Sequence, residues 1–452
     1  MSRTDPPDDL AQFSAMLARG QSSGIHQPAP PSPEAARSKR KRRRITALVV
    51  TLVVFAAIGT YVPMTLLAPA GAASLSTSAH VVTIPAATTL ALPRGTEAAA
   101  SIAGGADFEK LTGSKELLPT SGANNPLPIA SISKLITALV ILSAKPLTTG
   151  QAGPTITFSK DDAKLYDKYY VLQASIAKMN SGSTMSEHDA LAVMLVASAC
   201  NYAEAVSTWA FGSPAGFVSA TKAWLSKNGL SGTRMVESTG LDPRNVSTPT
   251  DLIAIGKIAL ANPVIAAIVA TRGLDLPGTG VLQNTNELLG SDGVTGIKTG
   301  TLADAGACLL FSAVVNVDSL APITVIGVVL GAGDHQSINT DVASFIQAIS
   351  AGFHTVTLTT KGDKYGQYVT AWKSHAGIVA AKDASVLTWS NTKVTSKVTT
   401  TSVTEASRGT KVGSITFTAG PSTVTVPLVT NGSITAPGAW WRLTHPSELL
   451  GK

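Results

Sequence analysis

The chain has 452 residues, of which 44% are hydrophobic, and this is enough apolar material for two or three domains. Its formal charge of +7 lies mainly in residues 1–44, which carry +5, whereas residues 45–67 carry none and the remainder carries +2. The folded part is therefore nearly neutral. With only two cysteines, no C-x-x-C pair and no histidines at metal-ligand spacing, the chain offers little support for a zinc site.

Residues 1–44 are rich in proline and poor in aromatic residues, which predicts a disordered basic tail. Residues 45–67 have no charge and are long enough to cross a bilayer as a helix. The basic run of residues 37–44 precedes this span, so the positive-inside rule places the N-terminus in the cytoplasm and the rest of the chain outside. We favour this role over nucleic-acid binding. We also favour an uncleaved anchor in the cell membrane over a signal peptide cleaved near Ala68-Pro-Ala70, because the leader is long.

Residues 68–90 are rich in Ala, Ser and Thr and are expected to form a linker. Residues 91–352 are expected to form an α/β domain in which antiparallel strands enclose a mostly helical insert. The elements expected there are a strand at 98–102, a buried helix at 131–144, helices at 187–196 and 214–227, strands at 296–300, 307–315 and 323–330, and a closing helix at 341–349.

Residues 353–452 show the Thr/Val alternation of half-buried strands, which predicts a separate all-β sandwich. Near its end, Trp440 and Trp441 could form a binding platform, but packing in the core is the commoner role of such a pair. Cys200 and Cys308 are expected to be buried free thiols, although one disulfide between them is the alternative.

The pattern S-x-x-K occurs five times and is a weak signal by itself. Ser131 differs from the others because it opens a buried apolar helix after a proline-bearing loop. Residues i and i+3 share a helix face, so Lys134 can reach the Ser131 hydroxyl. Burial beside a second cation favours the neutral amine, which can accept a proton. The lack of a G-x-S-x-G motif weakens a Ser-His-Asp alternative.

A second motif, Lys298-Thr299-Gly300, is predicted to lie on a strand at the edge of the cleft. Lys298 would supply fixed positive charge for a terminal carboxylate, and Thr299 would supply a hydroxyl donor. Gly300 would let a bound peptide approach the backbone closely. The backbone N–H groups of Thr301 and Ser131 could together form an oxyanion hole.

These motifs, with Ser198-Ala199-Cys200 between them, resemble the low-molecular-mass penicillin-binding proteins, and among them the serine-type D-alanyl-D-alanine carboxypeptidases. The resemblance runs from about residue 90 to 352, and the tail ending in residues 437–446 resembles the small β-domain that follows many of these catalytic domains. It implies a β-lactamase/transpeptidase-like fold and no metal or organic cofactor.

The resemblance further implies that Ser131 is acylated by a peptidoglycan stem peptide or by a β-lactam, that Lys134 takes its proton and that Ser198 relays protons. The middle motif of the family is usually S-x-N, but Cys200 stands at its third position here. A shift of one residue recovers Asn201 and loses the serine, so we prefer the register that begins at Ser198. Cys200 and Asn201 are both expected to contact the substrate, together with Lys298, Thr299, Gly300 and Thr301. Cys200 as the nucleophile is a weaker alternative.

Three functions remain open. A carboxypeptidase would deacylate with water, whereas a DD-transpeptidase would pass the acyl group to the amine of a second stem peptide. Both use the same residues for acylation. The third reading is a non-catalytic wall-binding protein on the same fold, which the altered middle motif leaves open. A β-lactamase is less well supported, because we find no acidic residue placed to activate a deacylating water.

Overall fold

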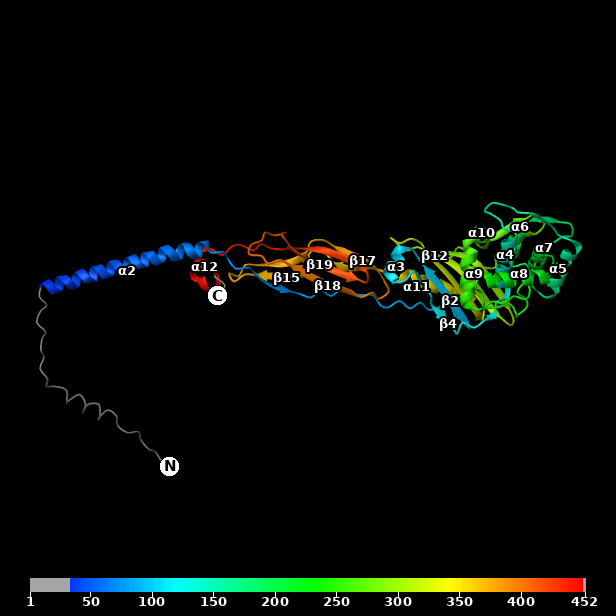
Figure 1. Cartoon of the computed structure of the whole chain (residues 1–452), viewed down its shortest axis with the longest axis horizontal. Coiled ribbons are helices and arrows are strands. Elements are labelled where there is room, and N and C mark those ends of the chain that lie inside the picture. Colours follow the sequence, from blue (N-terminus) through cyan, green and yellow to red (C-terminus); the bar gives the residue numbers. More distant parts are fainter. Residues whose placement is uncertain (1–32, 450–452) are drawn as a thin grey trace, which may run out of the picture. The chain divides into compact units, whose positions relative to one another are not determined.

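The computed structural model describes residues 33–449, with side chains from Arg37 onward (Figure 1). The expected tail at residues 1–32 lies outside the described residues. From Pro33 the prediction of disorder is wrong, because helix α2 spans Pro33–Leu67 and includes the basic run. Ala, Lys and Arg are good helix formers, so the apolar span continues into them. Within the described chain, α2 is long and apolar enough to cross a membrane.

The end of α2 is bound by a short C-terminal helix, α12, at Ala439–Thr444. The Arg442 guanidinium donates hydrogen bonds to the backbone carbonyls of Leu66 (3.3 Å) and Ala68 (2.6 Å). The last carbonyls of a helix lack partners within the helix, so this arginine caps α2 from outside. The Tyr61 hydroxyl also donates to the Leu443 carbonyl (2.7 Å). A final helix, α13, follows at Pro446–Leu449.

The two neighbouring tryptophans of this region have different surroundings. Trp441 stacks on His445 and meets Trp372 edge to face. Trp440 is 78% exposed. The expectation that the pair packs in a core is therefore wrong for Trp440.

A six-stranded antiparallel sheet forms the centre of the α/β region, as expected, with the order β11-β12-β13-β2-β3 and with β4 also paired to β2. Strand β11 is at one edge of the sheet. The expected strands are confirmed with slightly wider bounds: β2 at Glu97–Ala103, β11 at Val294–Leu302, β12 at Gly306–Val315 and β13 at Ile323–Ala332, beside the short β3 (Glu116–Leu117) and β4 (Thr120–Ser121).

Each face of this sheet has its own core, because successive side chains of a strand point to opposite faces. Leu310 of β12 lies in the core shared with the helical insert, whereas Leu309 and Phe311 lie in the core under α11 (His335–Ala351). Helix α11 begins six residues before the expected Asp341, because Asp334 caps it by accepting a hydrogen bond from the Ser337 N–H (2.7 Å).

The helical insert is confirmed, and the expected helices at 187–196 and 214–227 have the predicted bounds. Every residue from Ser133 to Leu142 is buried, so the helix that follows Ser131 is central. The helices of this region are α3 (Ala106–Thr112), η1 (Ala130–Ile132), α4 (Ser133–Ala144), α5 (Lys160–Val171), α6 (Glu187–Val196), α7 (Cys200–Phe211), α8 (Pro214–Lys227), α9 (Pro249–Ala261) and α10 (Pro263–Val269). Three two-stranded sheets join them: β5 (Leu127–Pro128) with β8 (Val246–Ser247), β6 (Thr155–Thr157) with β7 (Thr184–Ser186), and β9 (Gly273–Leu276) with β10 (Gly280–Gln283).

The C-terminal β-rich region contains a two-stranded and a six-stranded sheet, and the expected strands are present. The pair is β14 (Phe353–Thr359) with β17 (Ala384–Trp389). The larger sheet has the order β1 (Ser74–Thr77), β15 (Lys364–Val369), β16 (His375–Ala380), β20 (Ser422–Thr430), β19 (Lys411–Ala419) and β18 (Val394–Thr400).

One expected boundary differs from the structure and a second coincides with a break between elements. Residues 74–77, assigned to a linker, form the edge strand β1, and His80 packs against Tyr365 with its Nε2 2.8 Å from the Leu358 carbonyl oxygen. The expected boundary at 352/353 falls between α11 and β14. At this boundary Phe353 packs against Phe108 of the α/β region and against Trp389, so the two regions share apolar contacts there.

Candidate active site

The structure brings Ser131 and Lys134 together, as their spacing predicts. Ser131 lies in the 3₁₀ turn η1 and Lys134 in the first turn of α4. Lys134 Nζ lies 2.9 Å from Ser131 Oγ and donates to the Thr239 carbonyl at 2.6 Å. Lys134 has no exposed surface. A hydroxyl and a buried amine thus lie within proton-transfer distance.

The loop that supplies the Thr239 carbonyl is organised around the carboxylate of Glu237. This carboxylate accepts hydrogen bonds from the backbone N–H groups of Thr239 (2.5 Å) and Gly240 (2.6 Å), and from Asn245 Nδ2 (2.8 Å). Asn245 Nδ2 also lies 3.1 Å from Ser133 Oγ in α4. The loop is therefore bonded to the helix that carries Lys134. Sequence reasoning assigned no role to Glu237 or Asn245.

Gly240 in this loop lies against the backbone beside the serine. It has φ +86°, and a Cβ there would come within 1.9 Å of the Ala130 carbonyl oxygen. Only glycine combines a left-handed backbone with this close approach.

Lys298 lies in β11 and is buried at 2% exposure. Its Nζ donates to the Thr299 carbonyl (3.1 Å) and lies 3.4 Å from Thr285 Oγ1. Burial, and secondarily the charge of Lys134, lower the pKa of Lys298 to about 7, while Cys200 acts in the opposite direction. Burial therefore opposes the positive charge expected of Lys298, and the charged state at the site depends on what binds beside it.

Gly300 fulfils a different requirement from the one expected. A Cβ at this position would lie 2.9 Å from the Ile129 carbonyl oxygen and 3.1 Å from the Ser131 nitrogen. The group that approaches Gly300 closely is thus the turn η1, which contains Ser131. The absence of a side chain lets β11 pack against that turn, and this places the Ser131 N–H next to the Gly300–Thr301 segment.

The two threonines that flank Gly300 both have side-chain partners. Thr299 Oγ1 lies 2.5 Å from Thr285 Oγ1, and Thr301 Oγ1 lies 2.8 Å from His335 Nε2. Sequence reasoning missed Thr285 and His335. None of the motifs discussed above contains either residue.

The middle motif lies between α6 and α7. Ser198 is buried at 3% exposure and has a left-handed backbone with φ +57°. Ala130, directly before Ser131, also has a positive φ of 45°. Residues other than glycine are strained when φ is positive, and such backbone strain is found most often at functional sites.

The structure favours the register that begins at Ser198. The Asn201 side chain is fully buried and is bonded to the backbone of Ala177, donating to its carbonyl (2.7 Å) and accepting from its N–H (3.1 Å). Asn201 therefore holds the segment before α6, and its contact with a substrate stays a prediction. Cys200 lies close enough to Lys298 to affect its pKa.

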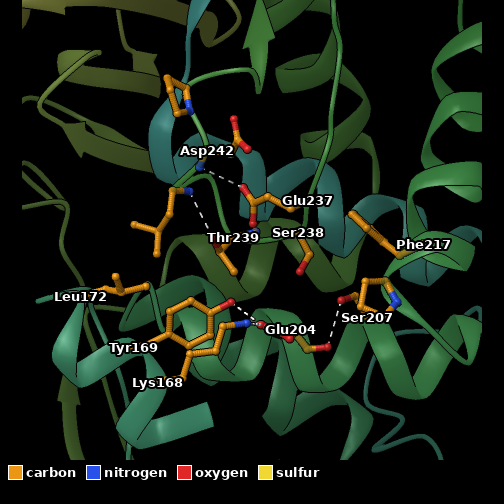
Figure 2. Close-up of a pocket in the computed structure, with 13 residues that line it drawn as sticks. Lys168, Tyr169, Leu172, Glu204, Ser207, Phe217, Glu237, Ser238, Thr239 and Asp242 are labelled. Atoms are coloured by element: carbon orange, nitrogen blue, oxygen red, sulfur yellow. Dashed lines mark hydrogen bonds and ion pairs between the residues drawn. The ribbon is translucent and has the colours of Figure 1, made fainter.

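A pocket of about 560 Å³ lies against the same loop, with Thr239 and Glu237 among its lining residues (Figure 2). Figure 2 shows Tyr169 and Lys168 side by side with their polar ends directed at Glu204, whose carboxylate accepts hydrogen bonds from both. Burial, and then Glu204, raise the pKa of Tyr169. The pocket thus shares a wall with the loop that positions Lys134.

Residues 110–334 match the family of D-alanyl-D-alanine carboxypeptidases. Through this segment the chain belongs to that family. It is 30% identical over 200 residues to the D-alanyl-D-alanine endopeptidase of Escherichia coli K12, an alignment that covers 42% of this chain and 60% of the relative. It is 28% identical over 237 residues to the D-alanyl-D-alanine carboxypeptidase of Streptomyces sp. K15, covering 48% and 77%.

This D-alanyl-D-alanine carboxypeptidase family member thus spans only 60% of the length of its E. coli relative. Penicillin-binding protein 5 from Haemophilus influenzae resembles it in structure, with a TM-score of 0.50 and 18% identity, covering 77% of this chain and all of that one. At this identity the likeness concerns the fold, and it agrees with the expected antiparallel sheet flanked by helices.

Proposed function

We propose that the protein is a membrane-anchored serine-type D-alanyl-D-alanine carboxypeptidase, which removes the terminal D-alanine from peptidoglycan stem peptides through an acyl-enzyme. The observation that carries this proposal is the 2.9 Å approach of the buried Lys134 amine to the Ser131 hydroxyl, within a domain of this family.

In the acylation step, neutral Lys134 accepts the Ser131 proton while Oγ attacks the carbonyl carbon of the penultimate D-alanine. The backbone N–H groups of Ser131 and Thr301 are the oxyanion donors, and losing one such donor typically costs about 10²–10³ in rate. Ser198 relays the Ser131 proton from Lys134 to the departing D-alanine amine. In deacylation, Lys134, neutral again, takes a proton from the water that attacks the ester and returns it to Ser131 as the shortened peptide leaves.

The carboxylate of the substrate is held by Lys298 and the hydroxyl of Thr299. An anion beside Lys298 favours its protonated form, so the substrate itself restores the charge that burial removes. A β-lactam presents a carboxylate beside a strained amide and acylates the same serine, which makes penicillins covalent inhibitors.

A DD-transpeptidase is the second candidate, because Cys200 replaces the usual asparagine of the middle motif next to the acyl-enzyme. A thiol is a weak hydrogen-bond donor and holds a deacylating water or acceptor differently from an amide. A β-lactamase gains no support from Glu237, the carboxylate in the loop that binds Lys134, because it is already bonded to backbone N–H groups and Asn245.

Helix α2 crosses the cytoplasmic membrane with its basic N-terminal end in the cytoplasm and the catalytic domain outside. The peptidoglycan stem peptide, which lies outside the membrane, is the partner that this topology presents to the site.

The test is mass spectrometry of a stem pentapeptide incubated with the full chain, with and without an acceptor amine. A tetrapeptide and free D-alanine in both cases support the carboxypeptidase, whereas a cross-linked product in the second case supports the transpeptidase. The Ser131→Ala variant must lose both the product and labelling by fluorescent penicillin. An intact protein that shows neither turnover nor labelling would point to the non-catalytic wall-binding protein.

A further inference from the structure

His335 and Thr301 meet at one end of the catalytic sheet. Strand β13 ends at Ala332, and α11 begins at His335. Thr301 is paired with Ala307, which in turn is paired with Ala332, so the register brings the start of α11 beside β11. His335 Nε2 lies 2.8 Å from Thr301 Oγ1. An imidazole from α11 therefore contacts the residue that follows Lys298-Thr299-Gly300.

The direction of this hydrogen bond decides what the Thr301 hydroxyl offers to a ligand. A hydroxyl has a single proton, and a neutral imidazole has a single N–H. When Nε2 carries no proton, it accepts the Thr301 proton, and the hydroxyl presents only lone pairs to the cleft. When Nε2 carries a proton, it donates to Thr301, whose own proton is then free to bind an anion. Thr301 is exposed, so its hydroxyl is open to a ligand.

The groups around His335 act on its charge in both directions. Burial is the largest effect and lowers the pKa of His335 below 6.5. The Lys298 charge lowers it further, whereas a hydrogen bond to the Gly300 backbone and the carboxylates of Glu287 and Asp334 raise it. The doubly protonated ring, in which Nε2 is always a donor, is therefore the acid-pH state of the site.

We propose that His335 is a positioning residue that turns the Thr301 hydroxyl toward a ligand carboxylate when the imidazole is protonated and away from it when the imidazole accepts. The site then prefers ligands with a free carboxylate most strongly at acid pH. This inference rests on the proposed function, because it concerns the carboxylate of the same acyl donor.

The test compares acylation of the full chain by benzylpenicillin and by its methyl ester between pH 4.5 and 8. Both ligands need the same proton transfer from Ser131 to Lys134, so the ratio of their acylation rates cancels that ionisation. One hydrogen bond to a charged group is worth about ten-fold in rate. We expect the ratio to fall by about this factor as the pH rises through the His335 transition, separately from the change that Lys298 causes near pH 7.

Variants separate positioning from a merely structural role. His335→Gln places a permanent N–H near the position of Nε2, so the ratio should keep its acid value without the acid step. His335→Leu neither accepts the Thr301 proton nor donates to its oxygen, so the ratio should become independent of pH in this range. Thr301→Ser keeps a hydroxyl and should keep the pH step in the ratio, whereas Thr301→Val should lose the step and should make the double variant with His335→Gln indistinguishable from Thr301→Val alone.

The outcomes distinguish the two proposals. If wild type, His335→Gln and His335→Leu were all acylated with the same ratio of rates at every pH, the role of His335 would be overturned and the proposed function would stand. If His335→Leu lowered the acylation rates of both ligands by the same factor, the residue would have only a structural role, and the inference would also be overturned. Failure of wild-type protein to react with either ligand would overturn the proposed function, and the inference with it.

Discussion

Lys134 Nζ donates a hydrogen bond to the backbone carbonyl of Thr239, with 2.6 Å between the two atoms. The two residues are 105 positions apart in the chain. The amine thus has one contact with the nucleophile and another with a loop whose own shape depends on Glu237 and Gly240. Changes in that loop should act on catalysis although none of its side chains reaches Ser131.

Gly240→Ala provides the sharpest test of the loop, because the new Cβ would overlap the Ala130 carbonyl oxygen. The loop must move, and misplacement by about 1 Å can cost about 100-fold in rate. We expect the rate of penicillin acylation to fall by about this factor, measured from the time course of labelling with a fluorescent penicillin.

Gly229→Ala is the matched control, since Gly229 also has a positive φ (+71°) but nothing lies within 4 Å of its Cβ position. It should cost about 1 kcal/mol of stability from backbone strain alone and leave acylation unchanged. Equal acylation rates in the two variants would contradict the role of the loop.

Lys298 should make the free protein more stable at alkaline pH. Its folded pKa of about 7 is below the ordinary value of 10.5, so between these values the unfolded state binds more protons than the folded state. Stability therefore rises with pH in this window, by up to about 1.4 kcal/mol per pH unit. Denaturant unfolding of wild type and Lys298→Met at pH 7 to 10 checks this, because the difference between them should grow with pH. A constant difference would mean that Lys298 is charged throughout.

The sequence predicts contacts in this site best where the residues that meet are close together along the chain. Ser131 and Lys134 are three residues apart on an apolar helix, so periodicity is sufficient to place them together. Thr285 and His335 reach the site through tertiary contacts with β11, and no local pattern encodes such contacts. The bonds of the Asn201 amide to the backbone of Ala177 are likewise a tertiary contact that the sequence pattern does not show.

The elements of the fold also differ in how well the sequence predicts them. Strong periodic elements were predicted within a few residues, whereas 74–77 was taken for a linker because a lone edge strand of four residues has too little pattern to detect. The early start of α11 depends on the Asp334 cap, a signal that was present in the sequence.

Glu187 should produce the opposite pH dependence to Lys298. It is fully buried, neither carboxylate oxygen has a hydrogen-bond partner in the described structure, and burial raises its pKa to about 7, against a smaller opposing effect of Lys145. Between 4.5 and 7 the folded state binds more protons than the unfolded state, so stability falls as pH rises. Glu187→Gln should remove this fall in denaturant unfolding at pH 4.5 to 7. The exposed Glu109→Gln should retain it, and a wild-type curve parallel to that of Glu187→Gln would refute the assignment.

Trp440 should report directly on the membrane. It is 78% exposed on α12, whose Arg442 caps the end of α2, and tryptophan prefers the interface between lipid and water. In liposomes whose lipids carry bromine on the upper acyl carbons, quenching of tryptophan fluorescence in the full chain should decrease clearly in Trp440→Phe. Trp224→Phe, which changes a half-buried tryptophan of the α/β region, should leave the quenched fraction unchanged. If Trp440→Phe is quenched as strongly as wild type, the end of α2 that bears α12 does not lie at the membrane surface, and α2 does not anchor the protein in the way proposed.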